Sequence, residues 1–460
     1  MKLRPQRSSP SLPSRPSARS GESASTLIIV LWIAFGLVSI TLYFAHSMTF
    51  ELRAADNRVC GLEAEQAIEG AARYVGYVLA SFQTNGALPD HAAFRSEAVP
   101  IADSHFWLIA RDTNNPVGSI GAPQLSFGLL DEASKLNLNT ASSNMLAFLP
   151  RMTADLTSRI LDWRNTNGGA ASQTYYAMQH PPYLCKSAPF ETVDELRLVV
   201  GADPDSMDIL LGEDSNRNGI LDPNETDDNH NGQVDPGLLE FVTVYSREPG
   251  TYSNSVPRIN VNSRQQLTQF LLQQNFSRQR VAQITTNLGP PFPVLASPLQ
   301  FYIRSRMKPD EFAQIASAIK VSNSTNSIEG RVNVNTASPA VLACLPGINS
   351  SPGLAQTLVS YRQANPDKLT SIAWLADALS GNKDALLALQ AADCITTQSY
   401  QFTADIAALG PHGRGYRRIR FVFDNMDGSP KIIYRQDLSH LGWALGKDVR
   451  QTWLVAKATP

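Results

Sequence analysis

A strongly apolar run of nineteen residues without charge extends from Leu27 to Ala45. At about 1.5 Å per helical residue it spans roughly 28 Å, close to the apolar thickness of a bilayer. Residues 1–19 hold five basic and no acidic side chains, which predicts that the N-terminus stays in the cytoplasm. A cleaved signal peptide is the alternative. Its apolar part would be shorter and end at a small-residue cleavage site, whereas Tyr43 and Phe44 continue the helix.

Beyond this run, apolar residues recur in steps of three and four, the spacing of one helical face. The series is Cys60, Ala64, Ile68, Ala71, Val75, Val78 and Phe82. It predicts one helix of about sixty residues that leaves the membrane and enters a folded domain. Gly86 and Pro89 end this helix. Since Cys60 lies on the apolar face, we expect a buried thiol.

Several later segments have the composition or alternation of strands. The predicted strands are His105–Arg111, Gln124–Leu130, Phe241–Ser246, Tyr416–Phe423 and Lys431–Arg435. The last two flank Asn425–Gly428, a hairpin turn signal. Because helical patterns separate these groups of strands, the expected fold class is α+β, with a helical block set into an antiparallel sheet.

An internal repeat lies within the helical block. Its copies begin at Lys135 and Arg331, and both contain an apolar-Asn-apolar-Asn-Thr-Ala-Ser sequence. A truncated third copy covers Arg258–Leu267. The alternation predicts a short strand, and the small polar residues after it predict the start of a helix. Duplication of a small strand-and-helix module is the simplest explanation.

The first two copies continue in parallel, with predicted helices at Leu156–Arg164 and Leu354–Arg362, and then near Val193–Val200 and Ile372–Leu379. The connection Leu345–Ile348 is similar to the turn of a helix-hairpin-helix motif, whose backbone amides contact phosphate. Packing of small helices is the alternative. A net charge of −2 argues against DNA as the main partner.

Two polar loops between the copies have the spacing of calcium-binding loops. In the first, the predicted ligands are Asp214, Asn216, Asn218, Ile220 through its carbonyl group, Asp222 and Glu225. Gly219 stands where the loop must turn sharply. Asparagine at two ligand positions lowers the negative charge, so we expect modest affinity. Since no long helices are predicted on both sides of the loop, we expect a structural clamp rather than a sensor.

The predicted ligands of the second loop are Asp227, Asn229, Asn231, Gln233 and Asp235. Its twelfth position is Leu238, so the bidentate carboxylate is missing unless Glu240 or another segment supplies it. An Asx-rich polar loop that simply turns well is the alternative.

No catalytic constellation is predicted. The seven histidines show no metal-ligand spacing, and the sequence contains neither a P-loop nor a nucleophile elbow. Asp162, Asp194 and Glu195 could face one another, but carboxylates in helical segments are usually solvated or salt-bridged. Gly410–Gly415 is interpreted as a loop before a strand rather than a phosphate site.

Together these residues resemble the K-type minor pseudopilin of the type II (general) secretion system. The resemblance rests on Leu27–Trp32, Asn137–Ala141, Asp162–Arg164, Pro181–Tyr183, Phe190–Leu196 and Asn333–Ala337. It implies a non-enzymatic subunit at the tip of a periplasmic pseudopilus, which supports the export of folded proteins across the outer membrane. The implied partners are other minor pseudopilins and the inner membrane, with the secreted substrate as a further candidate.

Members of this family also bind calcium, and the resemblance leaves open whether they use these two loops. The alternative function, from another class, is a membrane-anchored helix-hairpin-helix DNA-binding protein of a competence-type pilus. A catalytic role has no residues to support it.

On this resemblance the chain divides into seven segments. These are a basic cytoplasmic leader (1–25), a transmembrane helix (26–46), a pilin-like helix with the first strands (47–130), a first helical module with the calcium loops (131–236), returning strands (237–262), a second helical module (263–395) and C-terminal strands (396–460). The bulk after the transmembrane helix is expected in the periplasm.

The N-terminal segment departs from the family pattern in two ways. A prepilin peptidase cuts after a glycine beside the apolar run, but here Ser23 stands at that point and the nearby glycine is Gly21. Most pilins also carry a glutamate at the fifth mature position, where Thr26 or Ile28 would stand in this chain. Because a buried carboxylate is costly without its partner, this loss suits a subunit that caps a fibre.

Overall fold

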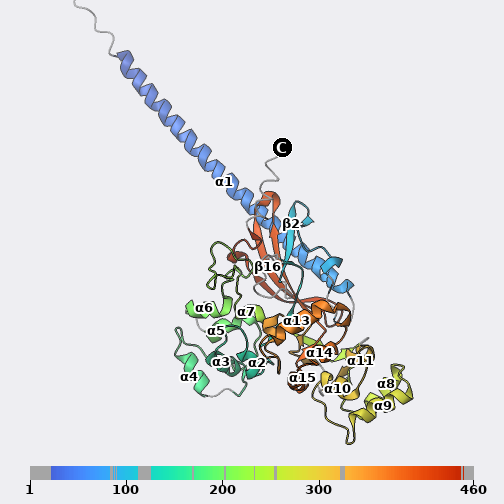
Figure 1. Cartoon of the computed structure of the whole chain (residues 1–460). Coiled ribbons are helices and arrows are strands. Elements are labelled where there is room, and N and C mark those ends of the chain that lie inside the picture. The colour runs from blue at the N-terminus through green and yellow to red at the C-terminus, as the bar shows by residue number, and fades with distance from the viewer. Residues whose placement is uncertain are drawn as a thin grey trace, which may run out of the picture. The chain divides into compact units, whose positions relative to one another are not determined.

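The computed structural model describes residues 22–82, 86, 89, 91–111, 126–167, 170–200, 204–232, 234–252, 256–321, 327–446 and 449. Figure 1 shows the chain from blue at the N-terminus to red at the C-terminus. The chain separates into two units, Met1–Val59 and Cys60–Pro460. Residues 1–21, which include the candidate processing residue Gly21, lie outside the described residues, and Ser23 lies at the start of the first helix.

Helix α1 covers Glu22–Ser81, sixty residues, and ends one residue before the end of the predicted apolar series. In the first unit its apolar side chains are exposed, including 75% of the surface of Trp32. The described helix is long and apolar enough to cross a membrane. Exposing so many apolar groups to water is unfavourable, so a bilayer is the environment that suits this part of α1.

The second unit contains the main antiparallel sheet, in the order β1-β2-β15-β16-β17. These strands are Val99–Ile101, Ser104–Ala110, Gln401–Leu409, Tyr416–Asp424 and Lys431–Asp437. The predicted face of α1, with Ile68 and Val75, packs on Phe106, Ile406 and Phe421 of this sheet. Figure 1 shows the end of α1 lying along the strands. The α+β fold class is therefore confirmed.

Three of the predicted strands correspond to β2, β16 and β17. The predicted strand at 124–130 is wrong as a single element, because its described part forms β3 (Ser126–Phe127) and β4 (Leu130–Asp131), which pair with β2 and β15 respectively. Gly128, at φ 155°, interrupts them. The central strand β15 is absent from the predicted strands, because all nine of its residues are buried and it shows no polar alternation.

The turn Gly410–Gly415 precedes β16, as predicted, and its glycines allow it to contact α1. A Cβ atom on Gly415, at φ +67°, would lie 2.2 Å from the carbonyl carbon of Cys60. Cys60 itself is only 3% exposed, which confirms the predicted burial of its thiol. These glycines therefore serve close packing of the turn on the helix.

The helical block lies between β4 and β15, so it interrupts the sheet over residues 132–400. Each repeat copy is closed by two short parallel strands. These are β5 (Leu136–Asn137) with β6 (Val242–Thr243), β10 (Ile259–Asn260) with β11 (Ile319–Lys320), and β13 (Val332–Asn333) with β14 (Ile395–Thr396). The third copy is therefore a complete module rather than a truncated one, and the segment 263–395 contains two modules.

One continuous core joins the helices of all three modules. The first module has α2 (Ser143–Ala147), α3 (Ala154–Arg164), α4 (Ala170–Ala177), α5 (Leu196–Val200), α6 (Pro204–Leu211) and α7 (Leu238–Phe241). The module that begins at Arg258 has α8 (Arg264–Gln273), α9 (Arg278–Leu288), α10 (Pro298–Ser305) and α11 (Pro309–Ala316). The module that begins at Arg331 has α12 (Pro339–Leu342), α13 (Leu354–Ala364), α14 (Trp374–Ala378) and α15 (Lys383–Gln390).

The segment expected to hold returning strands does not join the main sheet. Phe241 ends α7, so the predicted strand at 241–246 is reduced to the two residues of β6. The other strands here form two-stranded pairs, β7 (Arg247–Pro249) with β12 (Ser327–Glu329) and β8 (Thr251–Tyr252) with β9 (Val256–Pro257). This segment therefore connects repeat modules.

The second asparagine of each repeat copy binds the main chain of a later segment. The side-chain nitrogens of Asn139, Asn262 and Asn335 donate to the carbonyl groups of Phe190, Leu295 and Leu369 at 2.9, 3.2 and 2.8 Å. Because a partly buried polar group is costly without a partner, these bonds explain why the structure uses an asparagine at this position. They also show that the three modules share one internal architecture.

Two consecutive buried carboxylates attach the modules to the sheet. Asp131, at the end of β4, accepts hydrogen bonds from Asn333 at 3.1 Å, Thr336 at 2.5 Å and Ser399 at 2.6 Å. Burial raises the pKa of Asp131 to about 6, although these bonds oppose the shift.

Glu132 follows directly and accepts hydrogen bonds from Thr243 at 2.5 Å and Thr403 at 2.6 Å. Burial would raise the pKa of Glu132, but Lys135 and the two hydroxyl groups outweigh burial and lower it. Asp131 therefore connects the sheet to the module that begins at Arg331, and Glu132 connects it to the first module.

Candidate calcium loops and their attachment to the sheet

The first predicted calcium loop follows α6 and folds around its own oxygen atoms. Both carboxylate oxygens of Asp214 accept main-chain amides, from Asn218 at 2.8 Å and Gly219 at 2.9 Å. The side-chain oxygens of Asn216 and Asn218 accept the amides of Asn218 and Ile220, at 3.0 and 2.8 Å. Gly219 has a φ of +75° and makes the turn that these bonds require.

The two remaining carboxylates complete the first loop. Oδ2 of Asp222 lies 2.7 and 2.9 Å from the side-chain nitrogens of Asn216 and Asn218. Glu225 reaches back, and its two oxygens accept the amides of Asn216 at 3.3 Å and Asp222 at 3.1 Å. Burial raises the pKa of Glu225. The predicted side-chain ligands are thus brought together, and a set of carboxylate and amide oxygens fits a hard cation such as Ca²⁺.

The second loop repeats this arrangement. Asp227 accepts the amides of Asn231 at 3.1 Å and Gly232 at 2.8 Å, and the side-chain nitrogen of Asn229 lies 2.5 Å from Asp235. Gln233, another predicted ligand, lies outside the described residues. The carboxylate and amide side chains of the second loop therefore also converge.

Glu213, which no sequence pattern identified, places a buried carboxylate against the second loop. Its oxygens accept the main-chain amides of Asp228 at 2.9 Å and Asp235 at 2.8 Å, and only 5% of its surface is exposed. Glu225 binds the first loop in a similar way. The bridge between Gly212 and Pro236 brings Glu213 to this position, so the signal is tertiary and lies outside any twelve-residue pattern.

Glu240, the alternative source of a closing carboxylate for the second loop, instead pairs with an arginine of the sheet. Its Oε1 lies 3.4 Å from Nε of Arg111, the residue directly after β2. Burial would raise the pKa of Glu240, but Arg111 is the leading opposing charge and the net shift is downward. Glu240 is therefore part of the attachment between the loops and the sheet.

Arg418 of β16 donates hydrogen bonds to the main chain of the first loop. Its Nη1 and Nη2 donate to the carbonyl oxygens of Asn216 and Arg217, each at 2.6 Å. The same guanidinium forms two hydrogen bonds of 2.8 Å with Asp405 of β15. None of the Arg418 side chain is exposed. Burial would raise the pKa of Asp405, but Arg418 and Arg420 lower it far below its usual value.

Arg111 holds the same loop from β2. It donates to the carbonyl oxygens of Asn218 at 2.6 Å and Arg217 at 2.7 Å, and it lies 3.3 Å from Oδ2 of Asp214. A Cβ atom on Gly219 would lie 2.8 Å from this guanidinium, so glycine also provides the space that Arg111 occupies. Three consecutive carbonyl groups of the loop therefore face two arginines of the sheet.

The other acidic candidates do not converge. Asp194 accepts hydrogen bonds from Tyr434 and Gln436 of β17, at 3.1 and 2.8 Å. Glu195 accepts Trp163 Nε1 at 3.2 Å and pairs with Lys186 at 2.9 Å. Among the described residues, no three histidine, cysteine, aspartate or glutamate side chains gather as a metal-binding group.

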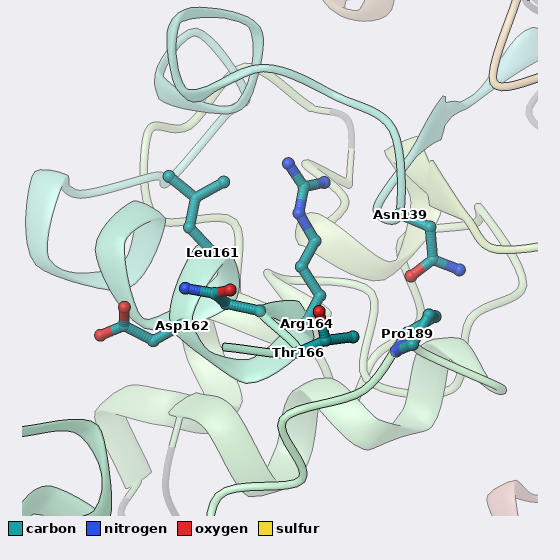
Figure 2. A pocket seen from close by; sticks show the side chains of 7 residues that line it. Asn139, Leu161, Asp162, Arg164, Thr166 and Pro189 are labelled. Carbon is teal, nitrogen blue, oxygen red and sulfur yellow. The ribbon is translucent and has the colours of Figure 1, made fainter. Parts of the chain in front are cut away.

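Asp162 instead lines an open hollow of about 400 Å³ on the first module. Figure 2 shows Asp162 and Asn139 on opposite sides of it, with Arg164 between them. The guanidinium of Arg164 donates to the carbonyl groups of Leu138 and Ala141. Asp162 is the single carboxylate among the described lining residues, so this hollow has the donors of neither a calcium site nor a carboxylate pair.

The helix-hairpin-helix-like turn is packed against a neighbouring helix. A Cβ atom on Gly347, at φ +82°, would lie 2.5 Å from the carbonyl oxygen of Ala385 in α15. The amide of Gly347 donates to Asn349 at 3.2 Å and that of Ile348 to Leu345 at 3.1 Å. Because these amides have partners within the fold, the turn gives no support to phosphate binding.

A long apolar helix whose C-terminal part packs on an antiparallel sheet, with repeated helical modules set between two strands, is the arrangement expected of a pilin-like subunit. Residues 134–211 and 332–392 each match a family model described as "Type II secretion system (T2SS), protein K". Two segments of the chain are therefore similar to protein K of the type II secretion system, in agreement with the predicted resemblance. Both calcium loops and the module of α8–α11 fall between the matched segments.

Among solved structures, the chain is similar to "The Crystal Structure of the GspK-GspI-GspJ complex from enterotoxigenic Escherichia coli Type 2 Secretion System". The match has 9% identity and a TM-score of 0.38, and it covers 84% of this chain and 99% of that chain. No curated protein matches the sequence.

Proposed function

We propose that this chain caps the tip of a type II secretion pseudopilus and has no catalytic role. In this proposal α1 holds the subunit in the inner membrane, with the N-terminus in the cytoplasm and the second unit in the periplasm. During assembly α1 then packs against the helices of other minor pseudopilins. The cap supports export of folded proteins across the outer membrane.

The place of the helical block carries this proposal. The block occupies residues 132–400, between two neighbouring strands of a sheet that packs on α1. A pilin-like subunit within a fibre has neighbours on both sides along the fibre axis. An insertion of this size beside the sheet demands space that such neighbours would occupy, whereas an end position leaves that space free.

The N-terminal sequence supports an end position. Neither Thr26 nor Ile28 supplies the carboxylate that would neutralise the amino terminus of an adjacent subunit. In an apolar fibre core, an unpaired charge is strongly unfavourable. A subunit at the end of the fibre lacks an adjacent subunit on one side. It therefore has no amino terminus to neutralise there and does not need this carboxylate.

Labelling tests the tip position directly. Pseudopili assembled with a tagged full-length chain should carry the tag at one end, as seen by immunogold electron microscopy. A matched sample with a tagged major pseudopilin should be labelled along its length. Label from the present chain along the whole fibre would contradict the proposal.

We further propose that both loops bind Ca²⁺ as structural clamps. Asp214, Asp222 and Glu225 would hold one ion with the Asn216 and Asn218 side chains, and Ile220 would add its carbonyl oxygen. Asp227, Asn229, Asn231 and Asp235 would hold a second ion, with Glu213 as the closing carboxylate. The support is the convergence of oxygen donors in both loops, since calcium favours six or more such ligands.

A thermal unfolding experiment tests the clamp. Calcium at millimolar concentration should raise the unfolding temperature of the detergent-solubilised full chain, because a ligand that binds the folded state stabilises it. Magnesium is the control, since it prefers a smaller octahedral site and retains water. A chelator that leaves the unfolding temperature unchanged would contradict calcium binding.

A further inference from the structure

We propose that the first loop is a calcium-dependent latch between the helical block and the main sheet, and that Arg418 is its positioning residue. This inference rests on the proposed calcium binding. In addition, it assigns to the ion control over the contact between the loop and the main sheet, which lies outside the twelve-residue pattern. Calcium would act on the attachment of the block as well as on the loop itself.

The loop has two sides with different partners. The side chains of Asn216 and Asn218 turn inward, to Asp222, and belong to the proposed ion site. The carbonyl groups of the same two residues turn outward, to Arg418 and Arg111, at 2.6 Å each. One short stretch of chain supplies both the side-chain oxygens of the proposed ion site and the carbonyl oxygens that the arginines bind. A movement that separates the side-chain oxygens therefore also displaces the carbonyl oxygens.

Charge makes the loop sensitive to the ion. Asp214 is 2% exposed and shares the loop with the carboxylates of Asp222 and Glu225. Like charges within one partly buried loop repel one another, and a divalent cation removes this repulsion. Arg111 offsets part of the charge from outside, through its contact with Asp214. Without calcium the loop therefore has a reason to open, and opening would pull its carbonyl groups from Arg418.

Arg418 is suited to sense this change. Its side chain is fully buried and fixed on Asp405 by two hydrogen bonds, so it cannot follow a displaced loop. Loss of its two carbonyl acceptors would leave buried donors unpaired, which is costly. Coupling between two binding events is reciprocal, so a rigid Arg418 that holds the carbonyl groups in place must also strengthen calcium binding.

A neighbouring arginine provides a matched control. Arg420 also pairs with Asp405, at 2.7 Å, but it makes no hydrogen bond to the loop among the described contacts. Arg418→Lys keeps the charge and removes the planar donor pair that contacts two carbonyl groups. Arg420→Lys disturbs the same carboxylate without removing a described hydrogen bond to the loop. The two variants therefore separate positioning of the loop from general stabilisation of the sheet.

The test is a calcium titration of the full chain in detergent by isothermal calorimetry. We expect Arg418→Lys to raise the calcium Kd of one site by about tenfold, as expected for loss of one charge-assisted bond. Arg420→Lys should change it less than about twofold. Equal effects of the two variants, or no effect of either, would overturn the latch. If the wild-type chain binds no calcium, the calcium proposal itself fails.

Amide hydrogen exchange of the wild-type chain tests the latch without a variant, and so remains available if Arg418→Lys does not fold. Removal of calcium by a chelator should speed amide exchange in β16 near Arg418 and in the loop. Helix α13, which lies in a different module, should exchange at an unchanged rate. Acceleration confined to the loop, with β16 unaffected, would overturn the proposed coupling.

Discussion

The carboxylate of Glu213 accepts the main-chain amide of Asp235 at 2.8 Å, which links the start of the first calcium loop to the end of the second. Asp214, the next residue, is the first predicted ligand of the other loop. Two consecutive residues thus serve two different loops. The second loop, which lacks a twelfth-position carboxylate in the sequence, thus has a carboxylate from Glu213 hydrogen-bonded to its main chain.

We predict that Glu213→Gln lowers the calcium stoichiometry of the full chain from two ions to one. An amide has one oxygen in place of two and no charge, so the closing position of the second site is lost. Calorimetric titration in detergent measures the number of ions. Glu225→Gln is the matched variant for the first site. Retention of two ions by the Glu213 variant would show that this carboxylate has only a structural role.

The difference between the two loops shows what could be predicted from sequence. The first loop was identifiable because all its ligands lie within twelve residues. Glu213 was not, because it reaches the second loop only after the chain reverses at the Gly212–Pro236 bridge. The α1 helix was predictable for the same local reason, since its periodic pattern directly reports which face is buried.

The repeat gives a second example of this limit. The copy that begins at Arg258 loses the shared sequence after Leu267, so it was interpreted as truncated. Its Asn262 nevertheless makes the same main-chain bond as Asn139 and Asn335. A half-buried polar residue with a tertiary partner is common to all three copies while the apolar residues around it differ, because many apolar side chains of similar volume pack equally well.

We predict that Asp131→Asn changes the pH dependence of stability. Since burial raises the pKa of Asp131 from 3.8 to about 6, the folded state holds this proton more tightly than the unfolded state. The associated stability is complete below the unfolded pKa and is lost as pH rises through about 6. Asparagine cannot ionise, so the variant should gain about 2 kcal/mol relative to wild type between pH 4.5 and 7.5.

The adjacent Glu132 provides a control with the opposite sign. Its pKa is lowered by Lys135 and the hydroxyl partners, so its contribution is present above the unfolded pKa and is lost in acid. Glu132→Gln should therefore lose stability relative to wild type as pH rises. Urea unfolding of the full chain in detergent, followed by tryptophan fluorescence, measures both differences. Parallel pH profiles for the two variants would contradict the assignment for Asp131.

We predict that Gly347→Ala destabilises the chain far more than Gly353→Ala. Both residues have a φ of +82°, so both substitutions incur the strain of a left-handed alanine, about 1–2 kcal/mol. Only Gly347 faces a neighbour, the Ala385 carbonyl oxygen, at 2.5 Å from an added Cβ atom. The difference in unfolding temperature therefore measures the close packing of the hairpin on α15. Equal shifts would mean that α15 can move away at little cost.

We predict the largest loss of stability for Glu248→Gln, because this buried carboxylate joins two repeat copies. Arg258 and Arg331 occupy equivalent positions in their copies, and both contact Oε2 of Glu248, at 2.5 and 3.2 Å. Removing one partner from a buried ion pair typically costs about 3–5 kcal/mol, because the remaining charge stays buried.

Asp393→Asn is the matched control for this change. Asp393 also pairs with Arg331, at 2.7 Å, but 21% of its side chain is exposed and Arg331 would keep Glu248. Asp393→Asn should therefore lower the free energy of unfolding, measured in urea, clearly less than Glu248→Gln does. Burial would raise the pKa of Glu248, but Arg331 and Arg258 lower it, so the stabilisation is present above the unfolded pKa and lost as pH falls. The deficit of Glu248→Gln should accordingly shrink in acid, and a deficit independent of pH would show that packing, rather than charge, connects the two modules.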